Sequence, residues 1–168
     1  MEFKEVIRKR EAVRKFKDKA IEPEVLNQIL EAGRLAPTGA NKQPQRIYVL
    51  QSKEALAKMD EITPCRYGAP VALIVAADKS EAWEWEGYNG YEADAAIVAT
   101  HILLAATDAG VGSIWTGIVN QEGVRDHFNL PESVLPVAFI PLGYTADDYT
   151  GNPAHTKRKP LEEIVKYM

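Results

Sequence analysis

The stretch Pro70-Val71-Ala72-Leu73-Ile74-Val75-Ala76-Ala77 is short and continuously apolar. Such a run is typical of a β-strand buried on both faces, because neither of its two alternating sets of side chains can meet water. The run 134–143 has the same character, and residues 46–50 predict a further strand. We expect these strands to alternate with helices in a three-layer α+β or α/β domain. The strands are short and their connections vary, so composition alone does not fix the topology.

Helices are predicted between the strands. Residues 21–35 have Pro23 near the first turn and a stripe of apolar side chains, as in an amphipathic helix. Residues 80–90 break the pattern and are predicted to be a surface segment with aromatic side chains, Trp83 and Tyr88 among them. This segment is either a lid over a pocket or a loop whose aromatic side chains pack locally. The other predicted elements are short: helices at residues 1–10, 53–62 and 121–128 and after Pro160, and a strand at 113–118.

The longest predicted helix covers residues 92–109. Its polar side chains include Asp94, His101 and Asp108, seven residues apart, and almost everything else is Ala, Ile, Leu or Val. A helix with so narrow a polar stripe must be buried on most sides, which a second subunit would help to achieve. His101 has no metal-binding residue at ligand spacing on this helix, so we expect a structural or solvent-facing histidine.

The composition is that of an ordinary globular protein. The 168 residues are expected to form one domain, 1–168, with 46% apolar and 26% charged residues. A net charge of −4 argues against a nucleic-acid partner. The single Cys65 fits a reducing compartment, and we find neither an apolar run of membrane-spanning length nor a signal peptide. We therefore expect a cytoplasmic protein with no membrane partner.

One polar stretch stands apart: Ala36-Pro37-Thr38-Gly39-Ala40-Asn41-Lys42-Gln43-Pro44-Gln45. Its prolines fix φ, and Gly39 permits unusual backbone angles. Amide side chains both donate and accept hydrogen bonds, so they can read the edge of a planar heterocycle. Two interpretations stay open at this point, a binding loop and a well-decorated turn. We call residues 38–43 of this stretch the amide loop.

A basic stretch lies at residues 8–16, where five of nine side chains are cationic in a protein that is acidic overall. Guanidinium groups form fork-shaped contacts with phosphate oxygens, so Arg10 and Arg14 could hold one phosphate. The alternative is a solvated basic face. A second basic cluster, residues 155–159, precedes the last short helix.

Four separated stretches resemble the FMN-dependent nitroreductases. Residues 10–16 resemble the family's Arg-Arg-Ser-Val-Arg-x-Phe motif, and residues 36–44 its Ala-Pro-Ser-x-x-Asn-x-Gln-Pro loop. Residues 94–117 resemble its central helix followed by Gly-Leu-Gly-Ser-x-Trp-x-Gly, and residues 158–165 its closing Arg-x-Pro-Leu-Glu-Glu segment. The resemblance implies a nitroreductase-like three-layer α/β/α sandwich of the α+β class, with a central mixed, mostly antiparallel sheet.

The resemblance also implies an FMN site. Arg10 and Arg14 are expected at the phosphate, with added charge from the end of the chain, and the amide loop is expected to touch the flavin of a neighbouring subunit in a homodimer. Backbone groups near Thr116 and Gly117 are expected beside the isoalloxazine ring. The candidate cofactor-binding residues are Arg10, Glu11, Ala12, Arg14, Pro37, Thr38, Asn41, Gln43, Trp115, Thr116, Gly117, Lys157 and Arg158.

The implied chemistry is transfer of hydride from NADH or NADPH to flavin N5 and then to a small acceptor such as a nitroaromatic or quinone, in a ping-pong cycle. No catalytic side chain and no metal are expected, because the cofactor carries the reaction. Three residues depart from the motifs: Glu11 replaces a basic residue, Ala12 a serine, and Gln45 a frequent tryptophan. The alternatives are an FMN-binding or sensing protein with little turnover and a specialised enzyme such as a dehalogenase on the same fold.

Overall fold

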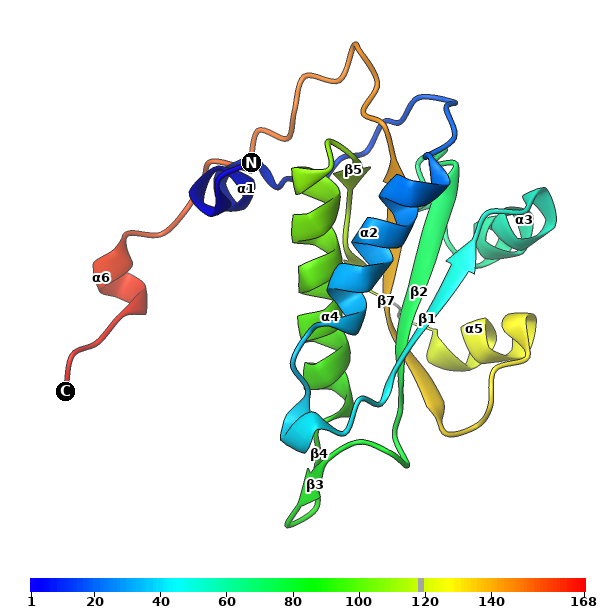
Figure 1. Cartoon of the computed structure of the whole chain (residues 1–168), viewed down its shortest axis with the longest axis vertical. Helices are drawn as coiled ribbons and strands as arrows, with labels where there is room; N and C mark the ends of the chain where they lie inside the picture. The colour runs from blue at the N-terminus through cyan, green and yellow to red at the C-terminus, as the bar shows by residue number, and fades with distance from the viewer. Residues whose placement is uncertain (118–119) are drawn as a thin grey trace.

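A five-stranded sheet forms the centre of the computed structural model, which describes residues 1–117 and 120–168 (Figure 1). The strand order is β1-β2-β7-β5, and β6 also pairs with β7. Each of the pairings described is antiparallel, in agreement with the expected mostly antiparallel sheet. The strands are β1 (Gln45–Leu50), β2 (Val71–Asp78), β5 (Gly112–Ser113), β6 (Thr116–Gly117) and β7 (Val134–Gly143).

Helices cover both faces of this sheet, as its apolar central strands require. Along β2, Leu73 and Val75 face a core cluster built with α2 (Pro23–Arg34) and α4 (Tyr91–Asp108). The alternate residues Ala72 and Ile74 face a second cluster on the other side of the sheet. That cluster is closed by α3 (Lys53–Ile62) and α5 (Gln121–Phe128). The predicted three-layer α+β architecture is therefore confirmed.

The remaining elements lie around this sandwich. The short helix α1 (Phe3–Lys9) contacts α4, and the hairpin of β3 (Glu84–Trp85) and β4 (Tyr88–Asn89) projects from the end where α4 begins (Figure 1). The C-terminal arm, which we define as residues 156–168, contains α6 (Leu161–Ile164) and extends away from the body (Figure 1). Within the described ranges, no helix is long and apolar enough to cross a bilayer.

The predicted strand at residues 113–118 is wrong as a continuous element. Two two-residue strands, β5 and β6, pair with β7 on either side of Ile114 and Trp115, and Ile118 lies outside the described residues. Pro141 of β7 has no N–H to donate, so the ladder is incomplete there. The single bond from Ile114 N to Pro141 O is long, at 3.4 Å.

The three members of the predicted polar stripe on the long helix differ in their burial. Asp94 is only 3% exposed, whereas His101 is half-buried and Asp108 is exposed. His101 Nδ1 lies 2.9 Å from the Ile97 carbonyl oxygen of its own helix. In the described part of the chain, no group of three or more His, Cys, Asp or Glu side chains could hold a metal ion.

We expect Leu73→Ala to lower the free energy of unfolding by about 2–5 kcal/mol, because Leu73 is fully buried and its truncation leaves a cavity. Urea denaturation followed by circular dichroism measures the change. Leu161→Ala is the control, since Leu161 is 64% exposed and its truncation creates no cavity in the chain described. Equal effects of the two substitutions would contradict the assigned core.

Candidate functional site

The basic stretch crosses one end of the sheet as an extended segment. Val13 N donates to Ser113 O at 3.0 Å and Lys17 N to Tyr144 O at 2.8 Å. An isolated bridge pairs Phe16 with Thr145, in the segment that follows β7. These bonds fix the backbone that carries the candidate phosphate-binding side chains.

The two arginines of this stretch are available to a ligand. Arg10 is half-buried and Arg14 is exposed, and neither has an ion pair or side-chain hydrogen bond with the described residues. The neighbouring Lys15 differs, because its ammonium group is paired with Asp148. Unpaired guanidinium groups on a fixed backbone suit a phosphate, which accepts bidentate hydrogen bonds.

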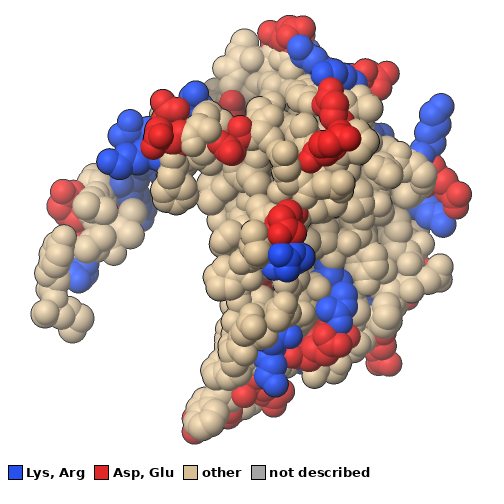
Figure 2. All heavy atoms as spheres, in the orientation of Figure 1, with Lys and Arg blue, Asp and Glu red and all other residues tan. Residues whose placement is uncertain are grey.

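The second basic cluster begins beside the first. His155 Nε2 lies 2.7 Å from Arg8 O, so the start of the C-terminal arm is held against the end of α1. Lys157 and Arg158 follow directly, and both are exposed. Lys and Arg side chains gather where the arm leaves the body (Figure 2). The structure thus brings together the two clusters that the sequence separates by more than a hundred residues.

Glu11, the acidic departure from the motif, is turned toward the far end of the chain. Its Oε2 accepts a hydrogen bond of 3.1 Å from Asn152 N. The next residue, Ala12, has no hydroxyl to offer, and its carbonyl oxygen accepts the Tyr149 hydroxyl at 2.9 Å. Burial raises the pKa of Tyr149, and the Glu11 charge raises it further. Side-chain and backbone bonds at these two positions therefore tie the basic stretch to residues 149–152.

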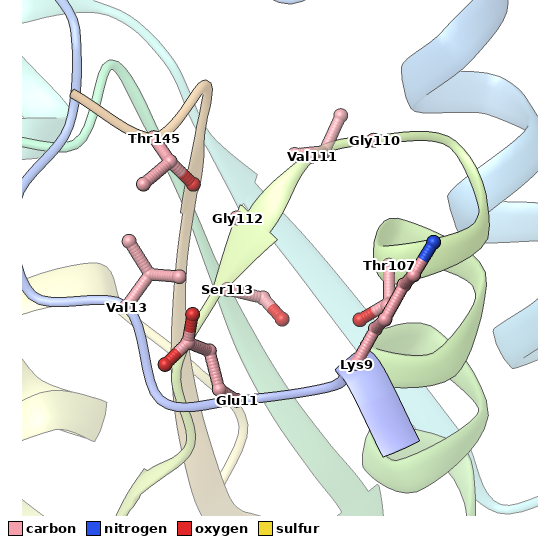
Figure 3. Close-up of a pocket in the computed structure, with 9 residues that line it drawn as sticks. All are labelled: Lys9, Glu11, Val13, Thr107, Gly110, Val111, Gly112, Ser113 and Thr145. Carbon is pink, nitrogen blue, oxygen red and sulfur yellow. The ribbon is translucent and has the colours of Figure 1, made fainter. Parts of the chain in front are cut away.

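A small polar cavity of about 140 Å³ lies behind the basic stretch, between the end of α4 and β5 (Figure 3). Lys9, Glu11, Thr107 and Thr145 line it together with Ser113, whose hydroxyl is directed into the space between β5 and α4. Ser113 is 2% exposed and its hydroxyl has no partner among the described residues. A water molecule is the smallest group that completes this hydrogen bonding.

The amide loop has a strained backbone. Ala40, Asn41 and Gln43 have φ of 48°, 53° and 53°, in the left-handed region that non-glycine residues rarely adopt. Thr38 stabilises the turn, because its Oγ1 accepts from Gln43 N at 3.0 Å. Pro37, Asn41 and Gln43 are exposed, so the amides are accessible to a ligand, although Gln43 Nε2 donates a long hydrogen bond of 3.4 Å to Asn41 O. Strain of this kind clusters at binding sites, which favours the binding loop over the decorated turn.

Asp94 anchors this loop, and the sequence interpretation missed that role. Its Oδ1 accepts a hydrogen bond of 2.8 Å from Gly39 N, across 55 positions of the chain. The signal that could have identified it was a carboxylate on the first turn of an otherwise apolar helix. The periodic spacing to His101 and Asp108 led instead to the prediction that Asp94 is one member of a narrow polar stripe.

The amide loop and the basic stretch lie at opposite ends of α4. The loop is bonded to Asp94 near the beginning of the helix, whereas the cavity behind the basic stretch is lined by Thr107 in its last turn. At about 1.5 Å per residue, these positions are about 20 Å apart. One chain by itself therefore does not bring the two predicted halves of the site together.

The third predicted segment, residues 115–117, lies on the sheet between these ends. Trp115 is half-buried against the core, and Thr116 Oγ1 donates to Phe139 O at 3.1 Å. Gly117 is exposed, and no described atom lies within 4 Å of where its Cβ would stand. Thr116 and Gly117 border a largely apolar cavity of about 180 Å³ beside α3 and α5. A planar ligand could approach the backbone closely here.

Comparison with known proteins identifies the family. The model of the nitroreductase family matches residues 7–66 and 64–144. The chain belongs to the nitroreductase family. A Methanothermobacter thermautotrophicus protein with the name NADH dehydrogenase/NAD(P)H nitroreductase is 36% identical over 158 residues, which cover 88% of this chain and 80% of that protein. The family predicted from the four motifs is thus confirmed.

Solved structures in the family share the fold. A nitroreductase family protein from Clostridium difficile 630 superposes with a TM-score of 0.92 at 36% identity, covering 99% of this chain and 98% of that one. A nitroreductase from Desulfovibrio desulfuricans, solved in complex with FMN, gives a TM-score of 0.85 at 27% identity, with 100% and 97% covered. The predicted fold class is confirmed by these similarities.

We expect Ala40→Gly to raise the free energy of unfolding by up to about 1 kcal/mol, because glycine adopts the left-handed region without the steric cost that alanine carries. Thermal or urea unfolding measures the change. The same substitution at Ala57, an exposed position inside α3, is expected to lower stability by about 0.5–1 kcal/mol. A loss of stability at both positions would contradict a strained amide loop.

Proposed function

We propose that the protein is an FMN-dependent oxidoreductase that takes hydride from NADH or NADPH and delivers it to a small acceptor, such as a nitroaromatic or a quinone. The observation that carries the proposal is the pair of arginines, Arg10 and Arg14, that have no ion pair or side-chain hydrogen bond with the described residues. They lie on a basic stretch whose first residue, Arg8, is bonded to His155 of the second basic cluster. Family membership, the names of the relatives and the FMN complex of the Desulfovibrio protein support the same enzyme class and cofactor. The single Cys65 suits the reducing cytoplasm, where both nicotinamide donors are available.

The residues present fit FMN. A phosphate dianion needs cationic donors that are not already neutralised, and Arg10 and Arg14 meet this condition among the described residues. Glu11 offers its carboxylate to Asn152 N, which uses part of its hydrogen-bonding capacity away from the arginines. Ala12 supplies no hydroxyl, so phosphate binding here rests mainly on charge.

The flavin ring is assigned to the segment at residues 115–117 together with the amide loop of a second copy. Gly117 leaves space for a planar group, and the exposed amides of Asn41 and Gln43 can bond the edge of a heterocycle. When bound, FMN supplies an electron sink that accepts and returns hydride at N5. The chain's own part is to hold, orient and partly desolvate the reactants, and we assign no side chain to proton transfer.

A homodimer completes the site in this proposal. The outer surface of α4 carries apolar side chains beside His101, including Ile97, which is 37% exposed, and it continues into a groove lined by Phe3 and Leu104. A two-fold axis perpendicular to α4 sets the two copies of this helix antiparallel. The same patch then serves both subunits. The amide loop of one copy then lies near the basic stretch of the other.

The C-terminal arm supports this assembly. Leu161 and Ile164 of α6 are 64% and 66% exposed, on a segment that leaves the body (Figure 1). The exposed apolar side chains of this short helix gain stability when a second copy covers them. We expect sedimentation equilibrium at low micromolar concentration to give a dimer, and Ile97→Asp to shift the population toward monomer with less FMN bound. A wild-type monomer that retains FMN would contradict the shared site.

We expect Arg10→Ala to weaken FMN binding by about 1.5–3 kcal/mol, the usual contribution of a hydrogen bond to a charged group. Fluorescence titration of the apoprotein with FMN measures the affinity. Lys15→Ala is the matched control, because Lys15 belongs to the same stretch but is already paired with Asp148. Unchanged affinity in Arg10→Ala would return the basic stretch to its alternative interpretation, a solvated face.

We expect initial-rate plots for NADH or NADPH against a quinone to give parallel lines, the pattern of a ping-pong cycle. Among the described residues, space lies open beside Gly117, and we infer that donor and acceptor occupy it in turn. Steady-state kinetics at several fixed acceptor concentrations gives the pattern. Intersecting lines would indicate a ternary complex. Tight FMN binding without measurable turnover would favour the alternative, a flavin-binding sensor.

A further inference from the structure

We propose that Asp94 is a positioning residue for the candidate active site, and that its buried carboxylate holds the amide loop in its strained conformation. The contact itself is independent of any assigned activity. The consequence for a flavin rests on the function proposed above, because the loop matters to catalysis only if it reads the cofactor.

The contact is direct and well protected from water. Asp94 Oδ1 accepts from Gly39 N at 2.8 Å, and Asp94 is 3% exposed. Its other oxygen, Oδ2, is buried without a hydrogen-bond partner among the described residues. A buried carboxylate with one unsatisfied oxygen lowers stability, so a compensating role is expected where it occurs.

Asp94 does not serve its own helix as a cap. The residue at the N-cap position of α4 is Gly90, and its carbonyl oxygen accepts Asp94 N at 3.0 Å. Tyr91 N, in the first turn, is bonded to the side chain of Asn89 at 3.2 Å. The nearby Glu92 is exposed and accepts the Tyr91 hydroxyl at 2.9 Å. In the described residues, the bond to Gly39 is therefore the only hydrogen bond made by the Asp94 side chain.

The far side of Gly39 is closed by Trp83, at the base of the β3–β4 hairpin. A Cβ at Gly39 would stand 2.9 Å from Trp83 Cβ, closer than unbonded carbons approach. Gly39 is thus required for space, and its amide is held between an aromatic residue and a carboxylate. The three left-handed residues follow within the next four positions, at Ala40, Asn41 and Gln43.

This clamp explains how the strain persists. Each left-handed non-glycine residue costs about 1–2 kcal/mol, so the loop relaxes unless its ends are fixed. Thr38 Oγ1 fixes the end at Gln43, with a bond of 3.0 Å, and Asp94 fixes the beginning at Gly39. A bond to an ionised acceptor is about twice as strong as a neutral one, which suits an anchor that resists this strain.

Hydrogen exchange tests the clamp without any cofactor. In the purified apoprotein we expect Asp94→Ala to speed amide exchange at Gly39 by about tenfold or more. The loss of one charge-assisted hydrogen bond shifts the local opening equilibrium of the loop by about that factor. Asp94→Asn keeps a neutral acceptor and should fall between wild type and Asp94→Ala. Glu92→Ala is the matched control, because it removes an exposed carboxylate from the same turn and should leave Gly39 unchanged.

The second measurement follows the flavin. At saturating FMN, we expect Asp94→Ala to slow flavin reduction by NADH or NADPH several-fold, and Asp94→Asn to recover most of the rate. If Asp94 had a purely structural role, the substitutions would lower stability without this difference in flavin reduction rate between the two variants. Arg10→Ala provides the opposite pattern, weaker FMN binding with unchanged Gly39 exchange in the apoprotein, since neither of the two side-chain bonds that hold the loop involves Arg10.

The outcomes separate the two proposals. Wild-type exchange rates at Gly39 in both Asp94 variants would overturn the anchoring role, whatever the protein binds. Faster exchange at Gly39 in a protein that never binds FMN would uphold the anchor and reject the proposed function. Faster exchange with unaltered flavin reduction would overturn Asp94 as a positioning residue. If Asp94→Ala does not fold, the graded exchange in Asp94→Asn decides.

Discussion

The structure depends on the burial of one strand on both of its faces. From Val71 to Ala77, β2 presents no polar side chain and is buried throughout. Burial of apolar surface contributes about 25 cal/mol per Å², so two separate layers of helices are needed to cover it. The helix α4 forms the main part of one layer, where it contacts β2, β7, β1 and β5 as well as α2.

The position of α4 in turn sets the geometry of the site. The helix runs the length of the sheet, so the two segments with candidate functional side chains are separated at its two ends (Figure 1). Gly33 of α2 would place a Cβ 2.9 Å from Ile102 Cγ1, which shows how closely the two helices approach. This close packing leaves the opposite surface of α4, with Ile97, as the apolar face available to another molecule.

Much of the fold could be predicted from local pattern. The run at 70–77 and the amphipathic helix at 21–35 are each decided by their own side chains, and both appear within a few residues of the expected bounds. The strand at 113–118 could not be predicted correctly, because its interruption depends on Pro141 in a partner strand. The register that places Pro141 opposite Ile114 is set by the whole sheet.

The site was predictable in its parts and less so in its connections. The basic stretch and the amide loop are recognisable from residue type, and the resemblance to the family motifs implies the roles proposed for them. Asp94 was placed in a polar stripe with His101 and Asp108, and helical periodicity does not tell which neighbour covers a face. Likewise, the sequence shows Glu11 only as an acidic departure from the motif. Its hydrogen-bond donor, Asn152 N, is remote in sequence.

The division of the site between the ends of α4 has a consequence for how the protein responds to its own abundance. On the proposed dimer, FMN binds only to the assembled form, so cofactor occupancy and association are linked by mass action. Dilution then favours loss of flavin, and added flavin favours assembly. Activity per chain would rise with expression level until nearly all chains are in the dimer. A cell with few copies of this protein would then have less turnover than the number of chains implies.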